Sequence, residues 1–289
     1  MFSLVRSDHS SMDKSSLLIL DTICMIYEAL IFLLTPTSPI AKKYGFLYQS
    51  IALQQRYKRC RTFWLNHLKS CQDLFLEAIK DLPQKKKVVI LGSAHLHEIP
   101  LHLLEQNFQE IVLVDIIHPL RHHWLAKKNS RLQLVTLDLS NALERLDKTN
   151  NLEDLKNLAR ELENQDLFFF DADLIVSANI MSQLALLPME HIEKKTKDSL
   201  ETSEKDDLCR RFAEMHLRSL LKCKGKKLIY ADREVIYLDK EENETYRGGY
   251  EVDFSHFQKM KEWIWYIAPL NEASKEYALK MKIEAYIAP

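Results

Sequence analysis

The sequence predicts an α/β fold, in which a seven-stranded, mostly parallel sheet ends in an antiparallel hairpin and follows an α-helical N-terminal segment. Three observations support this prediction. Residues 1–83 show helical patterns, whereas from residue 84 short apolar runs ending in Gly, Asp or Ser alternate with helical patterns. Two further apolar runs close the chain. We therefore expect a helical segment over residues 1–83 and one α/β domain over residues 84–289.

The net charge and the cysteine spacing of the chain argue against several classes of function. The chain has 289 residues and a formal net charge of −1, so no overall field attracts nucleic acid or an anionic membrane. We expect no nucleic-acid partner. The five cysteines form no C-x-x-C pair, which disfavours a disulfide framework or a zinc ribbon and is typical of a reducing, cytoplasmic compartment. The sequence leaves the oligomeric state open.

The helical segment begins with an apolar stretch, Leu17–Leu34, that resembles a membrane span. Asp21 and Glu28 lie seven residues apart within it, on one helical face, and an acidic residue in mid-span costs roughly 2.5–3.5 kcal/mol. We therefore expect a buried amphipathic helix and no transmembrane segment. Thr35–Pro39 interrupts this helix, and a second helical pattern then extends from about Tyr44 to Ile79.

Five short apolar runs are typical of strands buried on both faces. The expected strands are Val88–Leu91, Ile111–Asp115, Leu132–Leu137, Asp173–Ser177 and Lys227–Asp232. Helical patterns separate them at about Ile99–Asn107, Asp147–Gln165 and Leu208–Leu221, the last followed by Gly225 in a position typical of a helix C-cap. The runs Trp263–Ala268 and Tyr277–Ile287 flank Pro269 and Asn271 and are expected to form the antiparallel pair.

Chemically useful residues follow these strands directly. In parallel sheets, ligands bind at the carboxyl ends of the strands, where the strand order reverses. Gly92, Asp115, Asp138 and Ser177 all occupy predicted strand ends, so we expect them to converge at one edge although they are far apart in sequence.

Two of these positions have the pattern of a nucleotide site. Val88–Leu96 reads V-V-I-L-G-S-A-H-L, and its small residues Gly92, Ser93 and Ala94 allow close approach of a ligand to the backbone. Asp115 ends the next strand, at about the spacing from Gly92 that nucleotide-binding β-α-β units show. A carboxylate there can accept hydrogen bonds from two ribose hydroxyls. An ordinary turn after the strand and a helix-capping acid remain alternatives for these two features.

Two later motifs complete the pattern. L-D-L-S, at Leu137–Ser140, offers Asp138 and Leu139 near the end of the third strand, although a capping role for Asp138 is an equal alternative. D-A-D-L-I-V-S-A-N-I-M-S-Q-L, at Asp171–Leu184, places polar groups in and after the fourth strand. These groups are Ser177, Asn179, Ser182 and Gln183.

With these motifs, residues from about Lys85 to Pro289 resemble the class I, Rossmann-like S-adenosylmethionine-dependent methyltransferase superfamily, including an uncharacterised bacterial methyltransferase-like subgroup. The resemblance implies S-adenosyl-L-methionine as cofactor and a small or medium-sized acceptor. It implies that Asn179 and Ser177 serve catalysis next to the acceptor. The cofactor-binding residues it implies are Gly92, Ser93, Ala94, Asp115, Ile116, Asp138, Leu139 and Ser177.

Two other classes of function stay open. The loop after the first strand contains only one glycine, and His95 and Leu96 would crowd a cofactor, so a catalytically inactive methyltransferase-like interaction module is the main alternative. A nicotinamide-dependent dehydrogenase is less consistent with the sequence, because no G-x-G-x-x-G motif is present and the chain closes with an antiparallel pair.

Three further patterns have ordinary structural explanations. Cys60, Trp64, His67 and Cys71 share a helical face, and we interpret them as a packed stripe and not as a metal site, because two turns between ligands are too far for one ion to be held locally. The spacing of His97-Glu98 to His102 differs by one residue from that of a zinc-protease motif. Finally, Tyr246–Tyr250 is expected to be a glycine turn, either a plain loop or a lid.

Overall fold

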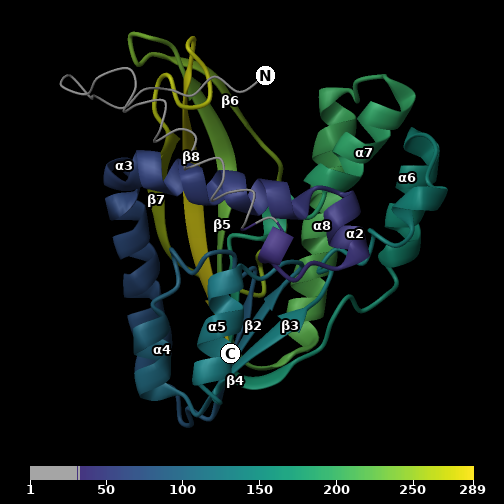
Figure 1. Cartoon of the computed structure of the whole chain (residues 1–289). Helices are drawn as coiled ribbons and strands as arrows, with labels where there is room; N and C mark the ends of the chain where they lie inside the picture. Colours follow the sequence, from purple (N-terminus) through teal and green to yellow (C-terminus); the bar gives the residue numbers. More distant parts are fainter. Residues whose placement is uncertain (1–30, 32) are drawn as a thin grey trace.

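The computed structural model describes residue 31 and residues 33–289 (Figure 1). Most of the predicted helix Leu17–Leu34 therefore lies outside the described residues. Thr35–Ser38 is non-helical, as the breaker motif predicts. Within the described part of the chain, no helix has both the length and the apolar character that a membrane span requires.

A single mixed sheet forms the centre of the molecule, with the strand order β3-β2-β1-β4-β5-β8-β7 and β6 paired to β5. Strands β1 to β5 pair in parallel, and β8 pairs antiparallel with both β5 and β7. The strands are β1 (Lys87–Leu91), β2 (Glu110–Asp115), β3 (Leu132–Thr136), β4 (Asp171–Ala178), β5 (Lys224–Leu238), β6 (Glu244–Gly249), β7 (Gln258–Ala268) and β8 (Ala278–Ala288). The predicted fold class and the closing antiparallel pair are confirmed.

The eighth strand is an addition to the predicted seven. Tyr246–Tyr250 was expected to be a glycine turn, but Glu244–Gly249 forms β6 and pairs antiparallel with the outer half of β5. The reason is that β5 continues beyond Asp232 to Leu238. A tight turn follows, in which Asp239 accepts backbone N–H bonds from Glu241 and Asn243 and so directs the chain back along β5.

The helices lie on both faces of the sheet, with α3 and α4 on one side and α6, α7 and α8 on the other (Figure 1). They are α2 (Pro39–Lys43), α3 (Phe46–Lys80), α4 (Leu101–Asn107), α5 (Leu120–Lys128), α6 (Leu152–Leu162), α7 (Leu186–Thr196) and α8 (Thr202–Lys222). Short 3₁₀ turns occupy Leu146–Lys148 and Met181–Gln183. Helix α8 begins before the predicted Leu208 because Glu201 and Glu204 form a capping box.

Alternate residues of β1 divide the core into two layers. Val89 and Leu91 belong to the apolar cluster that contains α6 and α8, whereas Val88 and Ile90 belong to the cluster that contains α3 and α4. Helix α3 is joined to the sheet as well by the Trp64 indole, which donates to the Ile267 carbonyl at 3.0 Å. The end of the helical N-terminal segment is thus part of the core of the sheet.

Gly225 has a role other than the predicted one. Helix α8 ends at the C-cap Cys223, and Gly225 lies within β5 with a φ of +101°. The β4–β5 register shifts between Asp171 and Leu174, and a Cβ atom on Gly225 would lie 1.7 Å from the Ala172 carbonyl oxygen. The glycine is therefore required by a sheet irregularity, not by the end of a helix.

Candidate functional site

The ends of β1 and β4 meet where the strand order reverses, which is the position expected for a ligand in an open α/β sheet. Gly92 follows β1 with a φ of +80°, and its N–H donates to the Val114 carbonyl at 2.9 Å. A Cβ atom at Gly92 would lie 2.7 Å from Cβ of Ile180 and 3.0 Å from the Ala178 carbonyl oxygen. The predicted convergence of these chain segments is therefore present, and Ile180 fills the space above Gly92.

The rest of this loop has an unusual backbone. Ala94 and Leu96 have φ values of 38° and 61°, a left-handed conformation that is uncommon outside glycine. The Ala94 N–H donates to Oδ2 of Asp115 at 2.7 Å. Strained backbone of this kind concentrates at ligand sites, where the surrounding structure holds it in place. Here one acid from β2 holds the loop that follows β1.

Asp115 has spare acceptor capacity. Its Oδ1 accepts the Ile116 N–H at 2.8 Å and, more weakly, the Ile117 N–H at 3.5 Å. Each carboxylate oxygen has two lone pairs, so Oδ2, which among the described residues accepts only from Ala94, can take another donor. Burial raises the pKa of Asp115 to about 6, although the backbone donors oppose this shift. Asp115 as a whole is 8% exposed, and with this pKa its carboxyl group is mainly ionised at neutral pH.

Ser93 supplies the clearest sign that the loop can hold a ligand. The residue is 1% exposed, and its hydroxyl meets no hydrogen-bond partner among the described residues. Buried hydroxyls are normally paired, because an unmade hydrogen bond costs about 1–3 kcal/mol. Together with the free lone pair of Asp115, this hydroxyl fits a polar ligand at the carboxyl end of β1.

The residues after β3 are held by local hydrogen bonds. Oδ1 of Asp138 accepts from the backbone N–H and the hydroxyl of Ser140, at 2.9 and 2.6 Å, and Oδ2 accepts from the Leu143 N–H at 2.9 Å. These bonds close a local turn, and the next helical element of the described chain begins only at Leu146, so Asp138 does not cap a helix. Leu139 is buried in the apolar core, and Ile116 packs against the same cluster.

Ser177 and Asn179 lie on different sides of the β4 end. The Ser177 hydroxyl is 2.9 Å from Nε2 of His216, and both side chains are in the interior beside α8. Asn179 has a φ of 50°, and its side-chain oxygen accepts the Asp232 N–H at 3.0 Å. The structure therefore places Asn179, and not Ser177, at the edge shared with Gly92.

We expect Ser177→Ala to lower the free energy of unfolding by about 1–3 kcal/mol, because it leaves the buried His216 without its hydrogen-bond partner. Urea denaturation followed by circular dichroism measures this change. A variant with unchanged stability but weaker ligand binding would instead place the Ser177 hydroxyl at the ligand.

Asp232 is a candidate that the sequence interpretation did not single out. It lies in β5 two residues beyond the end of the parallel pairing with β4, and its carboxylate accepts the Ser182 hydroxyl from the loop after β4. Burial is the main cause that raises the pKa of Asp232. Its position after a predicted strand, equivalent to that of Asp115 after β2, was a signal that could have identified it.

Helix α3 covers the loop after β1. Nε2 of His95 lies 3.0 Å from the hydroxyl and 2.8 Å from the carbonyl oxygen of Ser50, and Nε2 of His97 lies 2.8 Å from Oε1 of Gln54. The His97 ring also stacks on Tyr57 at 3.6 Å. Burial lowers the pKa of His97 to about 4, so this contact is uncharged at neutral pH. His95 and His97 therefore point toward α3.

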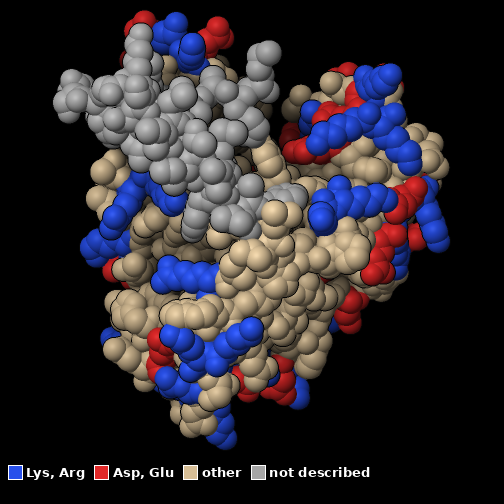
Figure 2. All heavy atoms as spheres, in the orientation of Figure 1, with Lys and Arg blue, Asp and Glu red and all other residues tan. Residues whose placement is uncertain are grey.

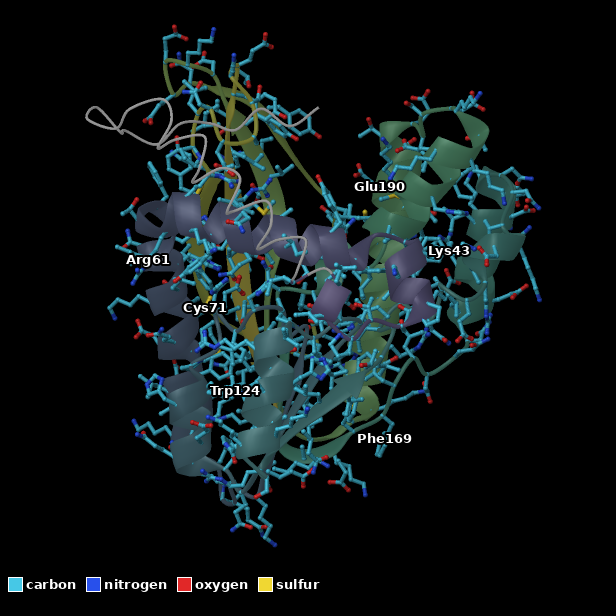
Figure 3. All side chains as sticks on the ribbon, in the orientation of Figure 1. Lys43, Arg61, Cys71, Trp124, Phe169 and Glu190 are labelled. Atoms are coloured by element: carbon cyan, nitrogen blue, oxygen red, sulfur yellow. The ribbon has the colours of Figure 1, made fainter. Side chains whose placement is uncertain are left out.

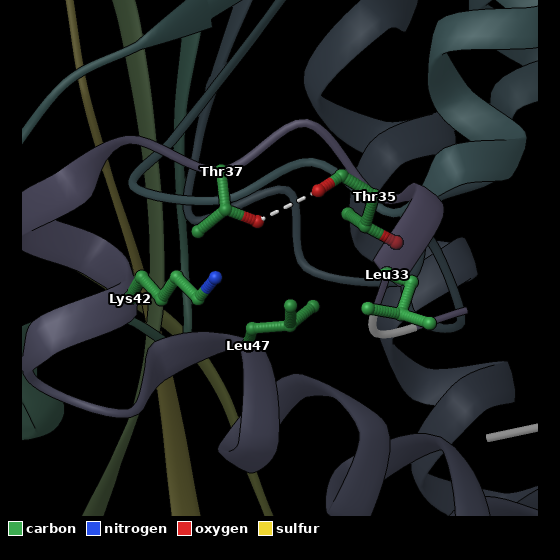
Figure 4. A pocket seen from close by; sticks show the side chains of 5 residues that line it. All are labelled: Leu33, Thr35, Thr37, Lys42 and Leu47. Atoms are coloured by element: carbon green, nitrogen blue, oxygen red, sulfur yellow. Dashed lines mark hydrogen bonds between the residues drawn. The ribbon is translucent and has the colours of Figure 1, made fainter. Parts of the chain in front are cut away.

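Two cavities border the start of this helical segment. One of about 220 Å³ is lined by Leu33, Thr35, Thr37, Lys42 and Leu47 (Figure 4). The other, of about 270 Å³, lies between the start of α3 and α7. Neither includes Gly92 or Asp115. On the face shown in Figure 2, acidic and basic side chains surround a broad uncharged area, and no single-sign patch dominates.

No protein-family model and no curated protein matches the chain. Among solved structures, it is similar to the N-methyltransferase NodS from Bradyrhizobium japonicum WM9 in complex with S-adenosyl-L-homocysteine, with 10% identity and a TM-score of 0.39 over 78% of this chain and 88% of that chain. It is also similar to the Burkholderia thailandensis 1,6-didemethyltoxoflavin-N1-methyltransferase with bound 1,6-didemethyltoxoflavin and S-adenosylhomocysteine. That match has 14% identity and a TM-score of 0.39, over 86% and 91% of the two chains.

A putative zinc-dependent alcohol dehydrogenase from Rhodobacter sphaeroides is similar too, with 15% identity and a TM-score of 0.29 over 56% of this chain and 45% of that chain. Likenesses at this level carry no argument about activity. The fold class rests on the strand order itself, and the candidate site rests on the contacts of its own residues.

Proposed function

We propose that this chain is an S-adenosylmethionine-dependent methyltransferase that acts on a small or medium-sized acceptor. The observation that carries the proposal is the contact between Asp115 and the loop after β1. An acid with a free lone pair, a strained small-residue loop and the unpaired Ser93 hydroxyl lie together at the switch point of the sheet.

Each part of the cofactor has a candidate partner. Asp115 would accept one ribose hydroxyl at the free lone pair of Oδ2 and the other at Oδ1, in place of the weak 3.5 Å bond from the Ile117 N–H, and the charge of the carboxylate strengthens both bonds. Gly92, Ser93 and Ala94 would approach the methionine part. Asp138, Leu139 and Ile116 would border the adenine. The second oxygen of Asp138 accepts a single N–H bond, from Leu143, and so retains capacity for a further donor.

The acceptor would bind on the β4 and β5 side. S-Adenosylmethionine, when bound, supplies a sulfonium methyl group for in-line attack by the acceptor nucleophile. The protein's contribution is to hold and desolvate that nucleophile. Asn179, Ser182 and Gln183 follow β4, and the Asp232 carboxylate joins this group through Ser182. Asn179 would orient the acceptor. Ser177, whose hydroxyl contacts His216 of α8, would not touch the acceptor and would act only by holding the end of β4 in position.

Helix α3 covers the loop after β1, where Ser50 and Gln54 contact His95 and His97, and Asp115 is only 8% exposed, so we expect α3 or the loop to move when the cofactor binds. A catalytically inactive interaction module would also have α3 packed over the loop after β1. The two functions differ in one property: only the methyltransferase binds the cofactor product at the carboxyl end of β1.

Titration calorimetry of the folded protein with S-adenosylhomocysteine tests the proposal. We expect saturable binding at micromolar to millimolar concentration, and no fluorescence change on mixing with reduced nicotinamide cofactor. Absence of any binding by folded protein at millimolar ligand would contradict the proposal and leave the interaction module. Binding of the nicotinamide alone would support a dehydrogenase.

Binding should also depend on pH through Asp115. Only the ionised carboxylate can accept both ribose hydroxyls, and burial raises its pKa to about 6 in the free protein. We expect constant affinity above about pH 7 and a decrease toward about tenfold per pH unit below pH 6. His97 and His122, with pKa values lowered by burial to about 4 and about 3, stay neutral over this range. Calorimetry between pH 5 and pH 8 measures it, and a flat profile would exclude Asp115 as the ribose acceptor.

A further inference from the structure

Three potential metal ligands meet between α3 and the loop after β1. His67 and Cys71 are four residues apart on α3 and therefore lie on one helical face. Glu98 reaches them from the loop. One ligand atom from each residue lies within 4.8 Å of the others. Figure 3 labels Cys71 on α3, and this cysteine and His67 are both 1% exposed or less.

The distances match those of a zinc site. Nε2 of His67 is 3.1 Å from Oε1 of Glu98 and 3.7 Å from Sγ of Cys71. A tetrahedral Zn²⁺ ion with ordinary bond lengths to nitrogen, oxygen and sulfur separates such ligand pairs by about 3.3 and 3.6 Å. Small adjustments of three side chains would therefore place three ligands around one ion, and the mixed nitrogen, sulfur and oxygen set favours Zn²⁺ over Mg²⁺ or Ca²⁺.

A fourth polar group lies beside the cluster. The Tyr230 residue is fully buried, and its hydroxyl has no well-formed hydrogen bond among the described residues. Burial is the largest cause that raises the pKa of Tyr230, and the nearby Glu98 and Cys71 raise it further. An unpaired hydroxyl in the interior costs stability unless something binds it. The Glu98 side chain is 18% exposed, which gives a cation a route from solvent to the cluster.

We propose that His67, Cys71 and Glu98 bind a divalent zinc-class cation that fastens α3 to the loop after β1, with the Tyr230 hydroxyl at or next to the remaining coordination position. The Cys71 thiol loses its proton on binding. The packed stripe expected from the sequence is present, because all four of its residues are buried, but His67 and Cys71 are only one helical turn apart, so the argument against a metal ion does not apply to this pair. The spacing of residues along α3 could not show that Glu98, in the loop after β1, provides the third ligand.

Trp263 should weaken metal binding, because its hydrogen bond favours the metal-free form of His67. Its indole N–H donates to Nδ1 of His67 at 3.1 Å. An indole nitrogen cannot accept a hydrogen bond, so the metal-free imidazole carries its proton on Nε2, toward Glu98. A cation at Nε2 transfers the ring proton to Nδ1, where it faces the indole N–H. Trp263 must then turn aside, and its removal should strengthen metal binding.

Cobalt titration of the full chain, stripped of metal by a chelator under reducing conditions, tests the proposal. We expect one equivalent of Co²⁺ to give a thiolate-to-cobalt charge-transfer band in the near ultraviolet, and Zn²⁺ to abolish it. Cys71→Ser should remove the band and lower Zn²⁺ affinity at least about 100-fold, since changes to groups that only support ligands already cost 10–100-fold. Cys60→Ser, a buried cysteine on the same helix, is the matched control and should leave both unchanged.

The variant Trp263→Phe provides a second test, because it should change the Zn²⁺ affinity only if His67 binds the metal ion. We expect it to raise Zn²⁺ affinity several-fold, whereas Glu98→Gln should lower it. A wild-type protein without a charge-transfer band at stoichiometric Co²⁺ would overturn the proposal even if Cys71→Ser fails to fold. A band that survives in folded Cys71→Ser would overturn it too. These outcomes are independent of whether the protein binds S-adenosylhomocysteine.

Discussion

Replacing Asp115 with alanine should lower the affinity for S-adenosylhomocysteine about 100-fold. Two charge-assisted hydrogen bonds to ribose hydroxyls contribute roughly 1.5–3 kcal/mol each, and a net loss of about 3 kcal/mol corresponds to two orders of magnitude. The variant also removes the acceptor for the Ala94 N–H, which loosens the loop in the direction of weaker binding. Calorimetry gives the affinity, and thermal melting shows whether the variant is folded.

Asp173→Ala is the matched control for this experiment. Asp173 also accepts two backbone N–H bonds, from Lys86 and Lys87 at 2.7 and 2.8 Å, but at the start of β1 and not at its carboxyl end. The control should lose stability without losing affinity. Equal affinity losses in both variants would mean that Asp115 acts only through stability, and an unchanged affinity in Asp115→Ala would remove it from the site.

Gly225→Ala should destabilise the fold by about 3 kcal/mol or more. A left-handed φ costs a non-glycine residue about 1–2 kcal/mol, and the added Cβ would meet the Ala172 carbonyl oxygen at 1.7 Å, so the β4–β5 pairing must also shift. Chemical denaturation measures the free energy of unfolding.

Gly45→Ala provides the comparison for that measurement. Gly45 has a φ of +75°, but no atom lies within 4 Å of the position that a Cβ would take, so the variant should lose only the backbone contribution of about 1 kcal/mol. Equal losses in the two variants would show that Ala172 does not constrain Gly225, and the sheet irregularity would lose its explanation.

The parallel strands could be predicted because their residues are apolar on both faces, as in Val88–Leu91 and Ile111–Val114. Strand β6 could not be predicted, because its residues are mostly exposed and it depends on a turn at Asp239 that redirects the chain. Helix α3 is a similar case, because its helical pattern predicts the helix itself. The pattern does not predict that Ser50 of this helix contacts His95 in the loop after β1.

The sequence could predict those parts of the candidate site in which a residue lies at the end of a predicted strand. Gly92 and Asp115 meet because β1 and β2 are neighbours, which the β-α-β pattern predicts. The direction of Ser177 was also encoded: it alternates with Val176 and shares a face with Ile175, which packs toward α8. The group of His67, Cys71 and Glu98 was not encoded locally, because its third member comes from a different element.

A crystal structure of the protein with S-adenosylhomocysteine tests the central claim most directly. We expect adenosine at the carboxyl ends of β1 and β2, with both ribose hydroxyls within hydrogen-bond distance of Asp115 and with α3 displaced from His95. An adenosine bound elsewhere, or an Asp115 carboxylate that still contacts only backbone N–H groups in the complex, would contradict it.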